Sequence, residues 1–209
     1  MRLALVLSTA LLLGTAGAAN AQWFEYKNLE ERFTVNFPAE PTVTTFTYTT
    51  EYNSRLPAKK FTAKDTRGSE YIMTVVDMQT TERDPARQGN ELRGSIAKAA
   101  TDLRLTGKVT LDAYSETNVI PGHQLQITLP DGRRNFVQIH LHMRRLYIME
   151  AIAVPGAPPP AVFQASLAIL DQAGNSPRYQ DNNYSFPEGT TVGRGAGQGG
   201  ARGPALTAQ

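Results

Sequence analysis

The alternation of apolar and polar residues predicts a domain that is mostly β-strand. In residues 32–37, Phe33, Val35 and Phe37 recur at every second position, which is typical of a strand with one buried face. Residues 69–78 are apolar almost without interruption. This indicates a central strand that is covered on both faces.

Residues 42–52 form a long run of threonine, valine and aromatic side chains that predicts another strand. Residues 56–63 are its expected return strand, with residues 53–55 as the turn. Two interpretations of the first strand remain open. It lies at a sheet edge and accepts a partner strand, or it pairs on both sides, with 56–63 and with the strand around Phe33.

Helical spacing appears twice. Residues 90–104 carry one apolar stripe, which consists of Leu92, Ile96, Ala99 and Leu103. A second helix is predicted after Pro160, with Gly174 near its end, and its stripe consists of Phe163, Leu167 and Leu170. Between the helices we expect a meander of strands at residues 109–117, 123–129, 134–143 and 146–154.

The turn at residues 129–133 (Leu-Pro-Asp-Gly-Arg) predicts a three-residue hairpin loop with its glycine in the left-handed conformation. This loop pairs Leu125 with Val137 and Gln124 with Gln138. A two-residue loop would set Leu125 against Gln138, which would mix the buried and polar faces.

The histidines are the side chains best suited to bind a metal ion. His140 and His142 share one face of a strand, an arrangement that can begin a zinc or copper site. His123 falls opposite Ile139 on the apolar face, so the three histidines do not converge. Glu150 is the candidate third ligand: it faces His140 if the 143–147 turn has three loop residues, and Ile139 if it has two.

The alternative interpretation of these residues is a polar sheet face without metal. On that face the sequence predicts a partner-binding surface that consists of Gln124, Gln138, His140 and His142.

The first 21 residues predict export. Arg2 precedes an apolar run at residues 3–13, and the small-residue site at 19–21 leaves Gln22 as the mature start. The run is shorter than the about 20 residues that span a bilayer. We therefore expect a periplasmic or secreted protein with no membrane span after signal cleavage.

Composition indicates where the folded domain ends, how it is stabilised and which partners it excludes. A single domain is expected at residues 22–187, followed by a disordered glycine-rich tail at 188–209. The chain has no cysteine, so the domain must be stabilised by its hydrophobic core alone. With 21 basic and 19 acidic residues, no nucleic-acid partner is expected.

Catalytic motifs are absent from the sequence. It contains no G-x-S-x-G elbow, and its predicted folded part has no glycine-rich phosphate loop, so neither an enzyme nor a cofactor is predicted. A hydrolase would require a pocket lined by convergent serine, histidine and acidic side chains.

Residues 33–41 (Phe-Thr-Val-Asn-Phe-Pro-Ala-Glu-Pro) resemble the opening of PsbP-like domains and of related exported bacterial proteins. Residues 71–77, 145–151 and 163–167 are similar to the same exported proteins. Arg32 and Ala39 stand where that family usually has glycine. The resemblance implies an α+β fold in which helices flank an antiparallel sheet, as an α/β/α sandwich. It also implies a non-enzymatic role, because such proteins mostly bind or help assemble other proteins.

The sequence as a whole predicts an exported binding or assembly protein that acts on another protein of the cell envelope. The alternative is a periplasmic metal-binding protein that uses His140, His142 and Glu150.

Overall fold

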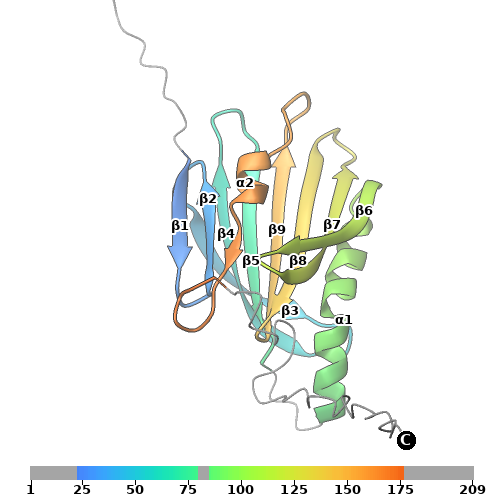
Figure 1. The fold of residues 1–209 in the computed structure, drawn as a ribbon. Coiled ribbons are helices and arrows are strands. Elements are labelled where there is room, and N and C mark those ends of the chain that lie inside the picture. Colours follow the sequence, from blue (N-terminus) through green and yellow to red (C-terminus); the bar gives the residue numbers. More distant parts are fainter. Residues whose placement is uncertain (1–22, 80–84, 177–209) are drawn as a thin grey trace, which may run out of the picture.

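The alternating segments pair into one curved, seven-stranded antiparallel sheet (Figure 1). The structure is a computed structural model that describes residues 23–79 and 85–176. The strand order is β3-β4-β5-β9-β8-β7-β6. The strands are β3 (Thr42–Thr49), β4 (Arg55–Lys64), β5 (Glu70–Asp77), β6 (Lys108–Thr117), β7 (Ile120–Thr128), β8 (Arg134–His142) and β9 (Arg145–Ala153).

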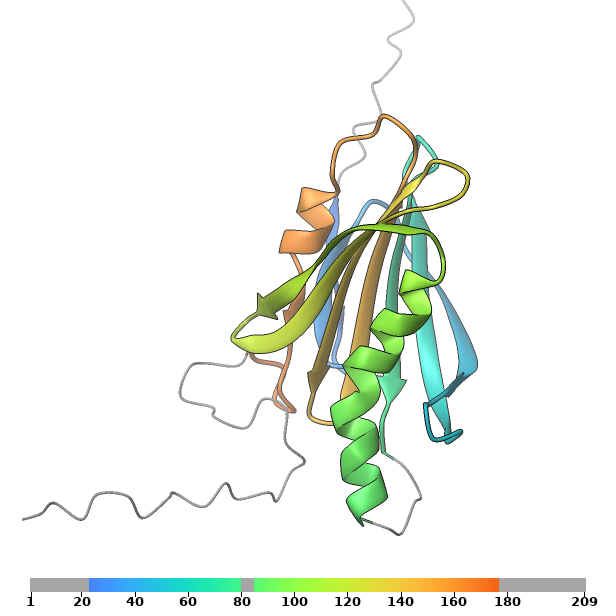
Figure 2. The same cartoon turned by 90° about the vertical axis from the view of Figure 1, so that its right-hand side faces the viewer.

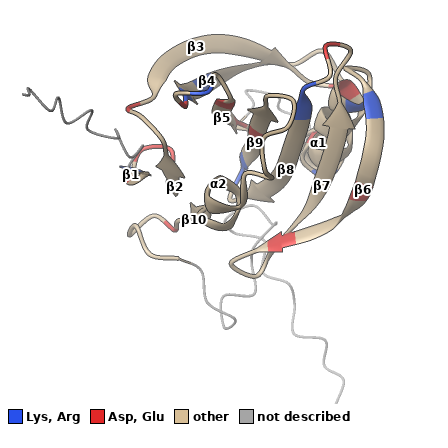
Figure 3. Cartoon of the chain, turned by 90° about the horizontal axis from the view of Figure 1, so that it is seen from above, with Lys and Arg blue, Asp and Glu red and all other residues tan. Residues whose placement is uncertain are grey.

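Each face of this sheet has a different cover. The long helix α1 (Pro85–Arg104) packs on β7, β8 and β9, and β6 and β7 curl around it (Figures 2 and 3). The other face is covered by a three-stranded sheet of β1 (Phe24–Asn28), β2 (Phe33–Phe37) and β10 (Ala168–Ile169), together with the short helix α2 (Ala161–Ala165). No helix in residues 23–79 and 85–176 is long and apolar enough to cross a membrane.

Two hydrophobic cores result, one on each side of the large sheet. Along β9, Leu146 and Ile148 point towards α1, whereas Tyr147 and Met149 point towards the small sheet. β5 is buried at every position between its first and last residues, so the prediction of a strand covered on both faces is confirmed.

The predicted β7–β8 hairpin register is confirmed. Leu125 pairs with Val137 and Gln124 with Gln138. The Leu129 N–H donates to the Arg133 carbonyl at 2.9 Å, and Gly132 has φ 81°, as a three-residue loop with a left-handed glycine requires.

The predicted second helix is wrong beyond its first turn. Helix α2 ends at Ala165, and the chain then forms β10, which pairs antiparallel with β2. Ser166 explains the break, because its hydroxyl donates to the Phe163 carbonyl at 2.8 Å and accepts the Asn36 N–H at 2.8 Å. Phe163, Leu167 and Leu170 are all buried, but they do not form one helical stripe.

Other boundaries differ from expectation. Strand β1 was not predicted, although its Phe24 and Tyr26 alternate towards the aromatic core. Helix α1 begins at Pro85, five residues early. The long 42–52 strand ends at Thr49, and the turn occupies residues 50–54. The structure is thus of the α+β class, with a long helix on only one face of the large sheet. The predicted leader, the predicted tail and residues 177–187 lie outside the described ranges.

Candidate partner-binding edge and groove

His140 and His142 do not form part of a solvent-exposed polar surface. They are 0% and 2% exposed and lie on the same face of the large sheet as Tyr147, which belongs to the core shared with the small sheet. Gln124 and Gln138, the other two residues of the predicted partner surface, are paired across strands and half-buried. The prediction of an accessible binding face at these four residues is therefore wrong for the two histidines.

Glu150 lies on the opposite side of the sheet from both histidines. The β8–β9 turn has two loop residues, Met143 and Arg144, both in the left-handed region at φ 43° and 58°. The loop closes on the His142–Arg145 pair, one position earlier than the expected two-residue loop, so Glu150 falls opposite Val137 and not opposite Ile139 or His140. The Glu150 carboxylate accepts a hydrogen bond from Asn135 at 2.8 Å, and burial raises the pKa of that carboxyl group.

The structure therefore does not bring His140, His142 and Glu150 together. Among residues 23–79 and 85–176, no group of three His, Cys, Asp or Glu side chains is placed to hold a metal ion.

His123 lies opposite Ile139, as predicted. Ile139 belongs to the core that packs against α1. Its ring contacts the Asp112 carboxylate at 2.6 Å, and Arg104 holds the same carboxylate at 2.7 Å. Hydrogen bonds from Arg104 and His123 hold the pKa of Asp112 below its usual range. This cluster joins the end of α1 to β6, so we assign it a structural role.

The His140 ring lies directly against Gly122. A methyl group on Gly122 would approach His140 Nδ1 to 2.3 Å and the Ile139 carbonyl oxygen to 2.4 Å. Burial lowers the pKa of His140 to about 4, and the nearby backbone of Ile120 and Pro121 offsets only part of that effect. His140 is thus a neutral core residue at neutral pH.

Strand β3 is the most accessible strand of the large sheet. It lies at the sheet edge and pairs with β4, which confirms the predicted hairpin. Within the described residues it has no partner on its other side, because β2 belongs to the small sheet. Every residue of β3 except Tyr48 is exposed, and Phe46 remains 40% exposed.

The direction of the β3 backbone groups follows from its hairpin. Thr50 donates its N–H to the Ser54 carbonyl at 3.0 Å, so the N–H of Thr50 points towards the other strand of the hairpin. In the unbroken register of the hairpin, the even residues of β3 direct their N–H and C=O groups at β4. Val43, Thr45 and Thr47 therefore present theirs outwards.

The other sheet edges in the described chain carry features that discourage further pairing. Strand β6 contains Lys108, Asp112 and Glu116, and its ladder with β7 is interrupted by a bulge at Thr110. Strand β1 carries Glu25 and Lys27, and β10 is only two residues long. Strand β3 has no charge, no proline and no bulge along its eight residues.

Helix α1 holds the β3–β4 turn in place. The buried Glu91 carboxylate accepts hydrogen bonds from the Thr50 hydroxyl, at 2.8 Å, and from the Ser54 hydroxyl. These contacts join the turn that ends the exposed edge to the helix.

Replacing Glu91 with alanine is expected to lower the free energy of unfolding by about 2 kcal/mol, because two hydroxyl donors lose their acceptor. Glu91→Gln is the matched control, since its amide oxygen can accept the same bonds. Urea denaturation followed by circular dichroism measures both, and equal losses in the two variants would contradict this role of the carboxylate.

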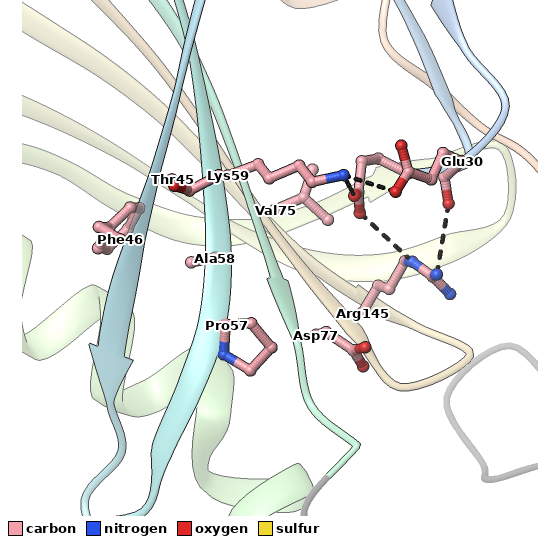
Figure 4. Close-up of a pocket in the computed structure, with 10 residues that line it drawn as sticks. Glu30, Thr45, Phe46, Pro57, Ala58, Lys59, Val75, Asp77 and Arg145 are labelled. Atoms are coloured by element: carbon pink, nitrogen blue, oxygen red, sulfur yellow. Dashed lines mark hydrogen bonds and ion pairs between the residues drawn. The ribbon is translucent and has the colours of Figure 1, made fainter.

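A groove opens beside β3 on the side of the small sheet (Figure 4). Pro57 has no N–H to donate to β5, and the β4–β5 ladder begins only at Ala58 and Val76. The groove lies beside Pro57, where the ladder between β4 and β5 stops, and has a volume of about 260 Å³. Its lining residues are Glu30, Glu31, Thr45, Phe46, Pro57, Ala58, Lys59, Val75, Asp77 and Arg145.

Charged side chains form one wall of the groove. The Lys59 ammonium contacts the Glu30 and Glu31 carboxylates, each at 2.7 Å (Figure 4). The hydrogen bond and charge of Lys59 lower the pKa of Glu30, so this carboxylate is ionised at neutral pH. No local pattern at Glu30 and Glu31 indicates that the β1–β2 turn meets β4.

The ladder geometry makes a direct prediction for hydrogen exchange. In the free protein we expect the amides of Val43, Thr45 and Thr47 to exchange at least about tenfold faster than those of Thr44 and Phe46, which donate to β4. Amide-resolved exchange followed by NMR measures the ratio. Equal protection of the two sets would show that the outer side of β3 is already covered.

A scan against protein-family models and a search of curated proteins gave no match to this sequence. The function is therefore argued from the chain itself. The feature of the described residues that is best suited to binding is the uncharged edge of β3 with the charged groove beside it.

Proposed function

We propose that this chain is an exported, non-enzymatic binding or assembly protein of the cell envelope, and that β3 takes up an extended segment of a partner protein. The observation that carries the proposal is the outward-facing row of backbone groups at Val43, Thr45 and Thr47 on an exposed strand without charges.

A partner strand would bind this edge by β-augmentation. Its backbone would supply hydrogen bonds to the outward N–H and C=O groups, and its side chains would alternate between the two faces. On one face its side chains would meet those of Phe46 and Tyr48, and on the other that of Thr45. The groove beside the strand is lined by both Thr45 and Phe46. Glu91 supports binding at this edge, because its hydrogen bonds to Thr50 and Ser54 fix the adjoining turn to α1 in the free protein.

The resemblance to PsbP-like domains supports the same role. It implies an antiparallel sheet with helices against its faces, and we infer a distant relationship in which the small sheet and α2 replace the second helical layer. Proteins of that type mostly bind or help assemble other proteins, which agrees with a function that depends on contact.

The groove also favours binding over hydrolysis. Its polar lining consists of carboxylates, cations and Thr45, and it contains neither serine nor histidine. It therefore lacks the nucleophile and base that a serine hydrolase would need there.

The test compares two substitutions at one outward position. Thr45→Pro removes an outward N–H and leaves the bonds to β4 intact, whereas Thr45→Val keeps that N–H. We expect a partner crosslinked from envelope extract by the native protein to be retained by Thr45→Val and reduced at least about tenfold by Thr45→Pro. Capture of the same proteins in equal amounts by both variants would overturn the proposal.

Export has its own test. The proposed signal peptide predicts that the protein recovered from outside the cytoplasm begins at Gln22, which N-terminal sequencing measures. Recovery of the full chain from the cytoplasm alone would contradict export.

A further inference from the structure

We infer that another pocket of this protein binds a phosphate group through the guanidinium groups of Arg32 and Arg144. The pocket lies at the end of the large sheet where the β8–β9 loop meets the start of β2, and it has a volume of about 280 Å³. It shares no lining residue with the groove beside β3. The inference therefore does not depend on the proposed partner strand.

The described lining of this pocket is cationic. It consists of Arg32, Gln79, Met143, Arg144 and Gln172, which provide two positive charges and no carboxylate. Each guanidinium group carries five N–H donors and no acceptor, and each glutamine amide can donate as well. Such a lining suits a negatively charged ligand with several acceptor oxygens.

Both guanidinium groups have donors to spare. The Arg32 guanidinium contacts the Met143 sulfur at 3.9 Å, and a thioether sulfur is only a weak acceptor. The Arg144 side chain makes no hydrogen bond or ion pair with another described residue. An anion in the pocket would therefore supply acceptors that the described chain does not.

The carboxylates close to the lining residues in sequence are engaged elsewhere. Glu31 contacts Lys59 at 2.7 Å and Arg145 at 3.7 Å. Asp77 lines the neighbouring groove, and Asp171 accepts a backbone N–H within its own turn at 2.9 Å. None of these three carboxylates lines the pocket.

Backbone hydrogen bonds fix the segments that carry the lining side chains. The Met78 N–H donates to the Arg144 carbonyl at 2.8 Å, which places Gln79 beside the β8–β9 loop. The Leu170 N–H donates to the Arg32 carbonyl at 2.8 Å, which places the segment after β10 beside the start of β2. The pocket is thus organised before a ligand binds, which lowers the entropic cost of binding.

Unusual backbone conformations are concentrated in the same pocket. Arg32, Met143 and Arg144 have φ values of 58°, 43° and 58°, in the left-handed region that such residues rarely adopt. They are three of the six described non-glycine residues with positive φ. Strain of this kind is typical of functional sites, where it holds side chains in position.

Charge and shape favour a phosphate group over a carboxylate. A phosphate group carries nearly two negative charges at neutral pH, which balance two arginines, whereas a carboxylate carries one. Its oxygens also point in several directions, so guanidinium groups from two different loops can each donate a pair of hydrogen bonds. The pocket is slightly smaller than the about 300 Å³ at which pockets for drug-sized ligands begin, as suits a small group.

Titration with inorganic phosphate, followed by NMR of the mature protein, tests the inference. At about pH 7.5 and low salt we expect a dissociation constant of about 1 mM or lower. Acetate at matched ionic strength should bind at least about tenfold more weakly, because it offers a single charge and fewer acceptors.

Two variants each remove one charge from the pocket and keep its backbone. Arg32→Asn and Arg144→Asn introduce asparagine, which tolerates the left-handed conformation. We expect each to weaken phosphate binding at least about tenfold. Arg55→Gln is the matched control, because it removes the same charge from an exposed arginine at the start of β4, and it should change the affinity by less than about twofold. Circular dichroism checks that the variants are folded.

A second arm of the experiment distinguishes a soluble phosphate from a lipid headgroup. Its probe is cosedimentation with phosphatidylcholine vesicles that contain or lack phosphatidic acid, whose headgroup is a phosphate monoester. Binding only to vesicles with phosphatidic acid, lost in both asparagine variants and displaced by inorganic phosphate, would make the ligand a headgroup. Binding of inorganic phosphate without vesicle binding would make it a soluble phosphate.

Three results would overturn the inference. They are the absence of phosphate binding, an equal affinity for acetate, and phosphate binding that either asparagine variant retains or that Arg55→Gln weakens as much. None of them concerns the β3 edge, which the comparison of Thr45→Pro with Thr45→Val tests separately.

Discussion

Replacing Phe33 with alanine is expected to lower the free energy of unfolding by about 4 kcal/mol, the typical effect of truncating a fully buried phenylalanine. Phe33 is 0% exposed on β2. Its ring meets Phe61 of the large sheet at 5.1 Å between centroids and Tyr26 of β1 at 6.1 Å. The substitution thus opens a cavity between the two sheets, where backbone ladders on both sides limit collapse.

Phe46→Ala is the control, because Phe46 is also on a strand but is 40% exposed at the edge. We expect it to change stability by less than about 1 kcal/mol. Urea denaturation followed by tryptophan fluorescence and circular dichroism measures both variants. A loss at Phe33 no larger than that at Phe46 would show that the small sheet is not a stable part of the domain.

Acidification from pH 7 to pH 5 is expected to remove about 2 kcal/mol of stability through His140. Burial lowers the pKa of His140 to about 4 in the folded protein, whereas the pKa of an unfolded histidine is about 6.5. Between these values the unfolded chain binds a proton that the folded chain excludes, so stability falls as the pH falls from 6.5 towards 4. Above pH 7 both forms are neutral and the contribution is constant.

The variant His140→Leu isolates this effect. It has no titrating group at position 140, so its loss of stability between pH 7 and pH 5 should be smaller than that of the native protein by about 2 kcal/mol. Carboxylates such as Glu150, whose raised pKa acts in the opposite direction, are present in both proteins and cancel in the comparison. Equal losses in the two proteins would mean that His140 becomes protonated without unfolding.

The features that could be predicted from sequence are those set by neighbouring residues. The register of the β7–β8 hairpin followed from the turn at residues 129–133, because a left-handed glycine and the alternation of faces allow one loop length. Strand β5 was recognisable as central because its apolar run needs cover on both sides. The stripe of α1 was recognisable because helical spacing is local.

Errors arose where a distant segment competes with local preference. The spacing of Phe163, Leu167 and Leu170 suits a helix, but β2 has an open edge at this point in the fold. The Leu170 N–H donates to the Arg32 carbonyl at 2.8 Å, and Ala168 and Ile169 pair with β2. These bonds replace helical ones, and no pattern near residue 168 indicates that β2 is there.

The histidines were misjudged for two physical reasons. The burial of His140 depends on the start of β7, because its ring lies against Gly122 and the backbone of Ile120 and Pro121. The place of Glu150 depends on Met143 and Arg144, which adopt left-handed conformations that ordinarily favour glycine or asparagine. Sequence patterns do not signal such a turn.

The sequence by itself determined the seven strands of the large sheet and β2, the apolar faces of the β7–β8 hairpin, and the long extended character of β3. Only the tertiary structure decided that β2 joins a separate sheet and leaves the outer side of β3 without a partner among the described strands. It also brought Glu30 and Glu31 from the β1–β2 turn beside Lys59 and Thr45. Strand pairing and the meeting of distant turns depend on how the whole hydrophobic core is best filled, and that is a property of the complete fold.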